Sequence, residues 1–279
     1  MRKALTLVAT GVATALALTA CGGSDSAASS VDSLDPTNPV TLTVGASPTP
    51  HARILEFVRD NLTADTGLEL EIQEFDDYVT PNISLNDGDS DVNFYQHLPY
   101  LESQMEKQGY DFEHGAGIHV EPYAAFSDKH DDASSIEDGA RVMVTNDPSN
   151  QARALKMLEE ADLVKDIADD SSVLTLTEEQ NFKNLDFQEN NPELLVNDLG
   201  DPTVDLAIIN GNYILEAGLN TDDALLVESA EDNPYANFLV WKTGNKDARI
   251  DKLEELLHSP ETKAFIEETW PNGDVTAAF

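Results

Sequence analysis

The feature that most constrains this chain of 279 residues is a strand–helix–strand pattern at the start of its apolar part. Residues 39–47, PVTLTVGAS, form an apolar run that ends in a turn. From His51 to Ala64, apolar residues recur at the spacing of one helix face. Residues 68–75, LELEIQEF, then alternate between apolar and polar side chains, as a half-buried strand does. The segment predicts a βαβ unit and therefore a parallel sheet.

A second series of strand and helix patterns follows. Strands are predicted within residues 140–147, 201–210 and 236–243. One helix is predicted to begin after Asp147 as its N-cap, with Pro148 in the first helical position, and another covers residues 248–259. Alternating strands and helices predict an α/β protein. In such sheets, ligands bind beyond the carboxyl ends of the strands.

The first 20 residues predict a secretory signal peptide. Arg2 and Lys3 precede a short apolar run of small residues that ends at Cys21. Cys21 is the only cysteine of the sequence, so it cannot form an internal disulfide. The residues LTAC resemble a bacterial lipobox, in which the cysteine is diacylated, and stable anchoring needs more than one acyl chain. We predict a lipid anchor at Cys21, on the extracytoplasmic face of the cell membrane; the alternative is an incidental cysteine near a cleavage site.

The segment after Cys21 predicts a flexible tether. Residues 21–39 are rich in Gly, Ser, Asp and Pro and contain very few large apolar side chains. Such a composition cannot bury enough apolar surface to become ordered by itself. We therefore expect the folded body to begin near Val40, connected to the membrane anchor by this segment.

The acidic composition excludes two classes of partner. The chain has 53 Asp and Glu residues, 16 Lys and Arg residues and a formal net charge of −37. Binding to a phosphate backbone requires a basic footprint, so nucleic acid is excluded as a natural partner. The same charge opposes adhesion to an anionic bilayer. We expect the highly solvated surface of an exported protein.

No enzyme motif supports a catalytic function. The sequence lacks G-x-S-x-G, H-E-x-x-H, G-x-x-x-x-G-K-[ST] and G-x-G-x-x-G. The stretch DGDSD does not match a calcium loop, because Val92 and Leu98 stand where the loop needs glycine and glutamate. His114 and His119 have no third ligand at a suitable spacing, so surface histidines are expected. We predict no enzymatic activity, no cofactor and no metal.

Ring side chains gather in the stretch DSDVNFYQHLPYLE. They are Phe94, Tyr95, His97 and Tyr100, and Pro99 argues against one helix through the whole stretch. Phe94 is predicted to be a core residue. The other three carry a polar atom that needs a partner when buried, and rings with polar tips also wall ligand pockets. From spacing alone, a pocket and a core position are equally supported for these three.

Arg153 is the second candidate for a binding role. It lies about one turn inside the helix that follows Asp147, and helix N-termini favour anions. A guanidinium can hold a carboxylate through two parallel hydrogen bonds. The alternative is a surface arginine that offsets neighbouring acids, and the residues alone favour that alternative.

Four stretches follow the lipobox and tether: FDDYVTPN (75–82), NFYQHLPYL (93–101), NDPSNQARAL (146–155) and AIINGNY (207–213). Together, and in this order, they resemble the methionine-binding lipoproteins of bacterial ABC importers, in the NlpA lipoprotein family. The resemblance extends from Val40 to Phe279 and implies a two-lobed, type II periplasmic-binding-protein-like fold with two crossover strands and a central ligand cleft. The first lobe would comprise residues 40–125 and 235–279, and the second residues 126–234.

The same resemblance implies a set of ligand-binding residues. The ligand side chain would lie in an aromatic cage, and the polar groups of the other lobe would hold its carboxylate and ammonium. The cage would be Tyr78, Tyr95, His97 and Tyr100, the carboxylate partners Arg153 and Asn150, and the ammonium acceptor Asn210. Tyr95 stands where the family usually has phenylalanine, and Leu98 where it often has a basic residue.

The function implied is that of a lipid-anchored extracytoplasmic substrate-binding protein. It would bind methionine, the L-form and as a further candidate the D-form, and deliver it by lobe closure to an ABC permease with a separate ATPase subunit. The alternatives are a binding protein for another apolar amino acid or a small peptide, and a non-transport surface lipoprotein or enzyme on the same scaffold.

Replacement of the lipobox cysteine tests the predicted anchor. Cys21→Ser removes the thiol that would carry the acyl chains, so the protein is expected to appear in the medium instead of the membrane fraction. Fractionation followed by immunoblotting measures this, and a variant that stays bound to the membrane would contradict the anchor.

Overall fold

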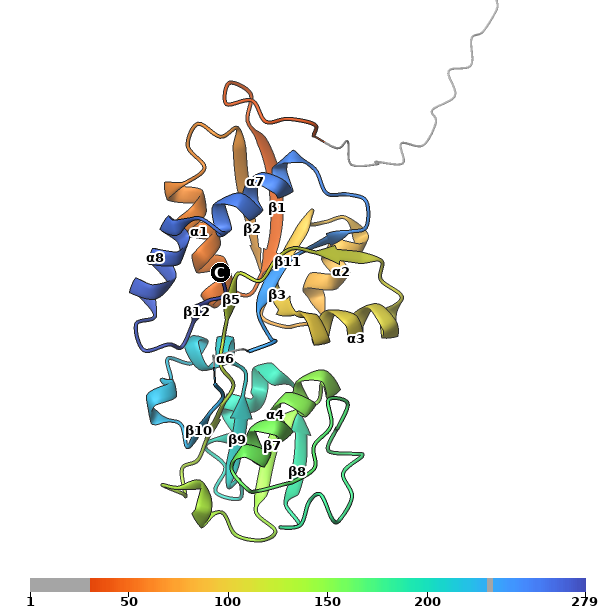
Figure 1. Cartoon of the computed structure of the whole chain (residues 1–279), viewed down its shortest axis with the longest axis vertical. Coiled ribbons are helices and arrows are strands. Elements are labelled where there is room, and N and C mark those ends of the chain that lie inside the picture. Colours follow the sequence, from red (N-terminus) through yellow and green to blue (C-terminus); the bar gives the residue numbers. More distant parts are fainter. Residues whose placement is uncertain (1–30, 230–232) are drawn as a thin grey trace, which may run out of the picture.

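The computed structural model describes residues 31–229 and 233–279, which fold into two α/β lobes (Figure 1). The lobe that follows the N-terminal segment, uppermost in Figure 1, also contains the C-terminus. The predicted signal peptide, Cys21 and the first part of the predicted tether lie outside the described residues. Within the described part of the chain, no helix has both the length and the apolar character to span a membrane.

The sheet of the first lobe has the strand order β12-β5-β11-β3-β1-β2, and β4 pairs with β11. Its strands are β1 (Val40–Ala46), β2 (Leu68–Glu74), β3 (Val92–His97), β4 (Phe112–His114), β5 (His119–Val120), β11 (Asn237–Lys242) and β12 (Thr276–Ala277). Its helices are α1 (Arg53–Asn61), α2 (Thr80–Asp87), α3 (Leu98–Gln108), α7 (Ala248–Leu257) and α8 (Pro260–Thr269), with a π-helical turn, η1 (Pro48–Ala52), before α1. Strand β1 is parallel to β2 and β3, whereas β11 is antiparallel to β3.

The predicted βαβ unit is present as β1–α1–β2. The two strands pair in parallel, with Val40 opposite Leu68 and Ala46 opposite Glu74. Helix α1 begins later than the periodicity predicts. Thr49 precedes a proline and has extended backbone angles, φ −139° and ψ 139°. A residue before proline is disfavoured in the helical region, and the residues up to Ala52 belong to the π-helical turn η1, so the regular α-helix begins at Arg53.

The sheet of the second lobe has the strand order β10-β6-β9-β7-β8. Its strands are β6 (Ala124–Phe126), β7 (Arg141–Thr145), β8 (Asp186–Asn190), β9 (Leu206–Ile209) and β10 (Leu226–Val227). Its helices are α4 (Pro148–Glu160), α5 (Leu195–Asp198) and α6 (Gly211–Glu216), with 3₁₀ turns η2 (Ala133–Ser135), η3 (Pro192–Leu194) and η4 (Thr221–Asp223). Strand β7 is parallel to β8 and β9, and β6 is antiparallel to β9.

The chain passes between the two sheets twice. The first crossover leads from β5 to β6 through Glu121, Pro122 and Tyr123, and the second leads from β10 to β11. The lobe boundaries implied by the family resemblance, 40–125 with 235–279 and 126–234, remain a prediction. Strand β6, which begins at Ala124, pairs within the second sheet.

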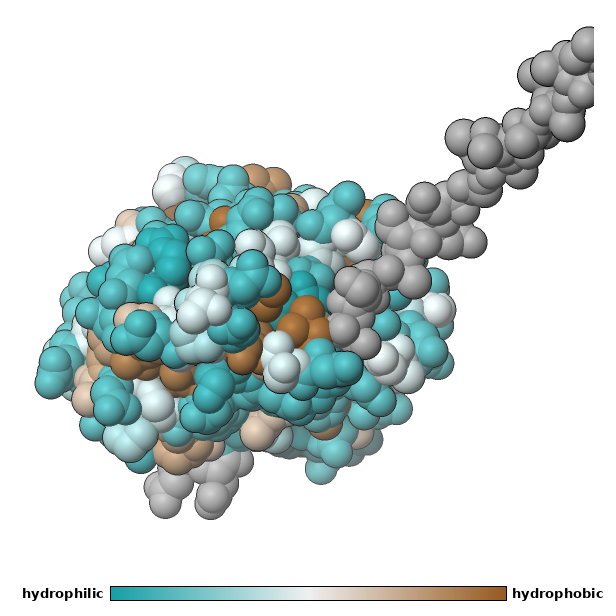
Figure 2. All heavy atoms as spheres, turned by 90° about the horizontal axis from the view of Figure 1, so that it is seen from above, coloured by the Kyte–Doolittle hydropathy of each residue, from teal (hydrophilic) through white to brown (hydrophobic). Residues whose placement is uncertain are grey.

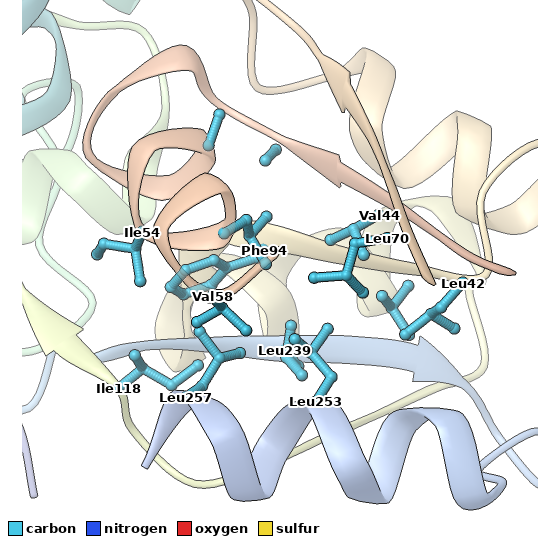
Figure 3. Close-up of a cluster of buried hydrophobic side chains, with 14 of the residues drawn as sticks. Leu42, Val44, Ile54, Val58, Leu70, Phe94, Ile118, Leu239, Leu253 and Leu257 are labelled. Carbon is cyan, nitrogen blue, oxygen red and sulfur yellow. The ribbon is translucent and has the colours of Figure 1, made fainter. Parts of the chain in front are cut away.

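Apolar side chains are buried in several clusters. In the first lobe, alternate residues of β1 (Leu42 and Val44) pack with Val58 of α1 and Leu253 of α7, and Figure 3 shows these side chains grouped between the sheet and the helices. Phe94, predicted to be core, belongs to this cluster and is fully buried. Burial of each large apolar side chain contributes about 1.5–3 kcal/mol to folding.

The surface agrees with the acidic composition. Figure 2 shows a mainly hydrophilic face in which hydrophobic residues form only small groups. Among the described residues, the large hydrophobic side chains that are exposed include Val79 and Leu174. Scattered residues of this kind are normal on a solvated protein.

Truncation in the first-lobe cluster tests the packing. Leu253→Ala removes a fully buried side chain and leaves a cavity, which is expected to lower the free energy of unfolding by about 2–5 kcal/mol. Urea denaturation followed by circular dichroism measures the change. Leu174→Ala, at a side chain that is 82% exposed, is the matched control and is expected to leave the unfolding midpoint in place. Equal effects in the two variants would contradict the assignment of the core.

Candidate ligand-binding site

A cavity between the two lobes brings together the seven site residues predicted from the sequence. The residues that line it are Tyr78, Tyr95, Gln96, His97, Tyr100, Glu121, Asn150, Arg153, Asn210, Gly211, Asn212 and Asn237. Its volume is about 30 Å³, on a scale where one water molecule needs roughly 10–15 Å³. The cavity is therefore narrow in this form of the protein.

Three tyrosine rings form one wall of the cavity. The ring centroids of Tyr78, Tyr95 and Tyr100 are separated from one another by 6.0, 5.9 and 6.0 Å. The hydroxyls of Tyr95 and Tyr100 donate hydrogen bonds to the main-chain oxygen of Tyr78, at 3.0 and 2.8 Å. Tyr95 has a hydroxyl that phenylalanine, the residue usual in the family, lacks, and this hydroxyl is thus already hydrogen-bonded within the protein. Burial raises the pKa of all three phenols, so they remain neutral.

The strand–helix junction after His97 explains why the ring cluster has no helical spacing. Strand β3 ends at His97, and α3 begins at Leu98 with Pro99 in its first turn. The imidazole of His97 serves as the N-cap, because its Nδ1 accepts a hydrogen bond from the backbone N–H of Tyr100 at 3.3 Å. The rings of the strand end and of the first helical turn therefore face the same cavity.

His97 connects the two lobes as a neutral imidazole. Since Nδ1 accepts a hydrogen bond, the proton lies on Nε2, which donates to Oδ1 of Asn150 at 3.0 Å. Burial, with a smaller effect of the Arg153 charge, lowers the pKa of His97 to about 3. Asn150 in turn donates from its backbone N–H and its Nδ2 to Asp147, the N-cap of α4. Most of the hydrogen-bonding capacity of Asn150 is therefore used within the protein.

Arg153 is buried and already holds a counter-charge. Its Nε donates to Oε1 of Glu228 at 2.8 Å, and its Nη2 donates to Oε2 of Glu228 at 2.5 Å and to the main-chain oxygen of Glu121 at 2.7 Å. The ring centroids of Tyr123 and Tyr235 lie 4.5 and 4.4 Å from the guanidinium carbon, Cζ, of Arg153. Burial lowers the pKa of Arg153, but Glu228 outweighs this and the pKa is raised, so the group stays charged.

The ion pair with Glu228 changes the expected geometry of carboxylate binding. The sequence suggests a guanidinium free to hold a carboxylate through two parallel hydrogen bonds. In the described part of the chain, the hydrogen bonds of Arg153 come from Nε and Nη2, and the Nε–Nη2 edge is taken by Glu228. Nη1 is therefore the nitrogen left to meet a carboxylate in the cavity.

Asn210 supplies an unpaired acceptor to the cavity. It follows the last residue of β9 and is 5% exposed. Within residues 31–229 and 233–279, its Oδ1 is buried and has no hydrogen-bond partner. A buried polar atom without a partner costs roughly 1–3 kcal/mol, and a ligand N–H group would remove this cost.

Sequence reasoning missed several residues of the lining. Gln96 and Asn212 lie within two of the motifs, and their polar side chains could have been considered there. Asn237 begins β11, just after the second crossover, and Glu121 lies in the first crossover. The one available signal for Glu121 was an acidic residue inside the apolar run IHVEPYAAF, which marks the break between β5 and β6.

Glu121 is held by two buried histidines behind the cavity. Its Oε1 lies 2.6 Å from Nε2 of His119 and 3.2 Å from Nε2 of His51, which also lies 3.2 Å from Oδ1 of Asn237. Burial lowers the pKa of His51 to about 4 and of His119 to about 3. Burial raises the pKa of Glu121, and His51 and Arg153 oppose this rise. The expectation of a surface position for His119 is wrong: it is fully buried, because β5 lies inside the first sheet between β12 and β11.

The same three residues are the candidates for a metal site in the described part of the chain. Their ligand atoms lie within 4.8 Å of one another. A metal-bound histidine, however, normally donates its second ring N–H to another group. Among the described residues, the Nδ1 atoms of His51 and His119 are buried and have no hydrogen-bond partner. The arrangement fits two neutral imidazoles that donate from Nε2 to a carboxylate better than it fits a metal centre.

The model of the NlpA lipoprotein family matches residues 42–279. The chain belongs to the NlpA lipoprotein family. It is 36% identical to the methionine-binding lipoprotein MetQ of Bacillus subtilis over 275 residues, which cover 96% of this chain and 94% of that one.

Solved structures of relatives have the same fold. A protein from Actinomyces odontolyticus is 49% identical, with a TM-score of 0.81 over 87% of this chain and 100% of that one. A nutrient binding protein from Burkholderia cenocepacia, solved bound to methionine, is 33% identical, with a TM-score of 0.77 over 85% of this chain and 100% of that one. The family and the two-lobed α/β fold predicted from the sequence are both confirmed.

The protonation state of His97 can be tested directly. With its pKa lowered to about 3, the imidazole is expected to stay neutral, with the proton on Nε2, from pH 8 down to pH 5. Nitrogen-15 NMR of labelled histidine measures this, with the His97→Gln variant to assign the signal. A titration of His97 with a midpoint near its ordinary value of about 6.5 would contradict the buried, cap-forming geometry.

Proposed function

We propose that this NlpA-family protein is a lipid-anchored extracytoplasmic substrate-binding protein that binds methionine and delivers it to an ABC permease with a separate ATPase subunit. The observation that carries the proposal is the composition of the interlobe cavity. One lobe contributes an aromatic wall, and the other contributes a buried guanidinium and an unpaired amide oxygen. A thioether amino acid has complementary groups at both ends. Relatives named as methionine-binding proteins support the same ligand.

The aromatic wall would hold the ligand side chain. Tyr78, Tyr95 and Tyr100 have their hydroxyls paired within the protein, so their ring carbons are available for apolar contact. His97, neutral and fixed by its two hydrogen bonds, would complete the cage. Sulfur–aromatic contacts contribute about 0.3–1.5 kcal/mol each. A cage of this kind favours an unbranched thioether over a charged side chain.

The polar side of the cavity would orient the amino-acid head. Nη1 of Arg153, with Asn150 beside it, would meet the ligand carboxylate. Oδ1 of Asn210 would accept a hydrogen bond from the ligand ammonium and so gain the partner that it lacks within the described residues. Because these groups belong to the second lobe and the cage belongs to the first, a ligand would contact both lobes.

Contact with both lobes would couple binding to lobe closure. Among the described residues, the hydrogen bonds that already cross between the lobes include Tyr78 Oη to Asn212 Oδ1 at 2.5 Å, Tyr213 Oη to the main-chain oxygen of Asp76 at 3.1 Å, and His97 Nε2 to Asn150 Oδ1 at 3.0 Å. The ligand would shift the balance between open and closed forms only through its additional contacts with the closed form. With a cavity of about 30 Å³, admission of a ligand would require the lobes to separate.

The alternatives concern the ligand and the role of the scaffold. Another apolar amino acid or a small peptide would use the same polar groups, and a surface lipoprotein without a transport role would need no permease. Native mass spectrometry of ligand retained during purification without denaturation separates the candidate ligands. Methionine uptake in a deletion strain tests the transport role.

Replacement of the guanidinium tests the binding site. Arg153→Ala is expected to weaken binding of L-methionine 100-fold or more, because the loss of one partner of a buried charge-assisted pair costs roughly 2–5 kcal/mol. Isothermal titration calorimetry measures the affinity, and thermal unfolding checks that the variant is folded. Lys156→Ala, which removes a positive charge from the partly exposed side of the same helix, is the control and should bind like the wild type. Unchanged affinity in a folded Arg153→Ala variant would refute the carboxylate assignment.

A further inference from the structure

In the described part of the chain, Glu121 is not paired with a Lys or Arg side chain in the way that Glu228 is paired with Arg153. Arg153, the cation of the cavity lining, is matched by Glu228 through the Nε–Nη2 edge. Glu121 is the acidic residue of the same lining, and the two imidazoles that contact it are neutral because burial lowers the pKa of both. Two neutral N–H donors stabilise a carboxylate but do not cancel its charge. A buried carboxylate without a cation of its own is costly, and a cationic ligand group would reduce that cost.

The position of Glu121 places it opposite the segment that carries Asn210. Strands β6 and β9 are antiparallel, with Ala124 opposite Ile209, so the residues before Ala124 run alongside the residues after Ile209. The approach is close: a Cβ atom at Gly211 would lie 2.5 Å from Cβ of Glu121 and 3.1 Å from the main-chain oxygen of Pro122. Glycine is therefore required at position 211 to bring Glu121 against the start of α6.

The two histidines contact one oxygen of the Glu121 carboxylate. Both imidazole contacts of Glu121 are made to Oε1, at 2.6 and 3.2 Å. Oε2 makes neither of these contacts, and a hydrogen bond from the backbone N–H of Asn212 opposes the rise in the pKa of Glu121 that burial causes. The carboxylate therefore lies against the segment Asn210–Asn212 that lines the same cavity, and a carboxylate oxygen can accept more than one hydrogen bond. His51 also contacts Oδ1 of Asn237, another lining residue, so the histidine pair holds two lining groups in a fixed relation.

We infer that Glu121 is the counter-charge for the ligand's ammonium group, that it acts with Oδ1 of Asn210 as a second acceptor, and that His51 and His119 position it. This inference rests on the proposed function, since it concerns the same cavity. It defines the ligand class more narrowly: the ligand must carry a free α-ammonium group. N-acylated amino acids lack the positive charge, and α-keto or desamino analogues lack both the charge and the N–H donor. Each would leave the Glu121 charge without a cation, whereas a change at the ligand carboxylate would not.

A thermodynamic cycle tests the inference: wild type and a Glu121 variant are each compared for binding of L-methionine and of an analogue without the ammonium group. Glu121→Gln keeps the size and an acceptor oxygen for the histidines but removes the charge. L-methionine and its desamino analogue, 4-(methylsulfanyl)butanoate, are titrated into wild type and variant by calorimetry. Glu121→Gln is expected to weaken L-methionine binding about 10- to 100-fold, the range of a hydrogen bond to a charged group, and to leave the affinity for the desamino analogue unchanged.

A matched control separates recognition from structural damage. Glu228→Gln also removes one buried carboxylate, but this one pairs with Arg153, so it should change the affinities for the two ligands by the same factor. Glu121→Asp, which keeps the charge, is expected to retain more of the preference for L-methionine than Glu121→Gln does. Thermal unfolding of every variant checks the fold.

The possible outcomes separate the inference about Glu121 from the proposed function of methionine binding. Equal weakening of both ligands in Glu121→Gln would assign Glu121 a purely structural role and overturn the inference, as would unchanged binding of both. If Glu121→Gln does not fold, the inference is supported when Glu121→Asp weakens L-methionine more than the desamino analogue, and overturned when it weakens them equally. A wild-type protein that does not bind L-methionine would overturn the proposed function and this inference together. If the wild type binds L-methionine and Glu121→Gln binds it equally well, the inference is overturned and the proposed function stands.

Discussion

The arrangement of the two lobes depends on how one buried guanidinium is neutralised. Arg153 is 5% exposed, and its partners come from both segments that connect the lobes: Glu121 and Tyr123 from the first crossover, Glu228 and Tyr235 from the second. A guanidinium left without these partners would cost several kcal/mol. Arg153 therefore connects α4 to both crossovers and at the same time lines the cavity.

The cavity is polar because it is the place where two separately stabilised lobes meet. The apolar clusters are largely confined to one lobe each, with Tyr78 and Leu215 as partly buried residues that reach across. The direct contacts between the lobes include hydrogen bonds of neutral groups, such as His97 to Asn150 and Tyr78 to Asn212. Neutral hydrogen bonds exposed to water on opening contribute only about 0.5–1.5 kcal/mol each. The lobe opening that the proposed function requires would therefore disturb neither core.

Local chemistry explains which parts of the fold and the site could be predicted. The alternation of apolar and polar side chains in residues 68–75 and the helix N-cap at Asp147 each depend on only a few neighbouring residues. Both the strand and the cap occur where the sequence predicts them. Pro99 correctly limits the helix to residues after β3. The pairing of Arg153 with Glu228 could not be predicted in this way, because the two residues are 75 positions apart. No local pattern carries that information.

What the sequence by itself determined is the alternating α/β order, from periodicity, and the family, from its motifs. Through the family resemblance it also picked out seven residues that line one cavity. Motifs and periodicity are local properties of the chain. What only the tertiary structure decided is how those residues are used. It placed His119 in the core, occupied one edge of Arg153 with Glu228, and brought Glu121 beside Asn210 across two antiparallel strands. The physical reason is that burial and charge pairing depend on which distant segments the sheets bring into contact, and these determine the protonation and the free hydrogen-bonding groups of every residue in the cavity.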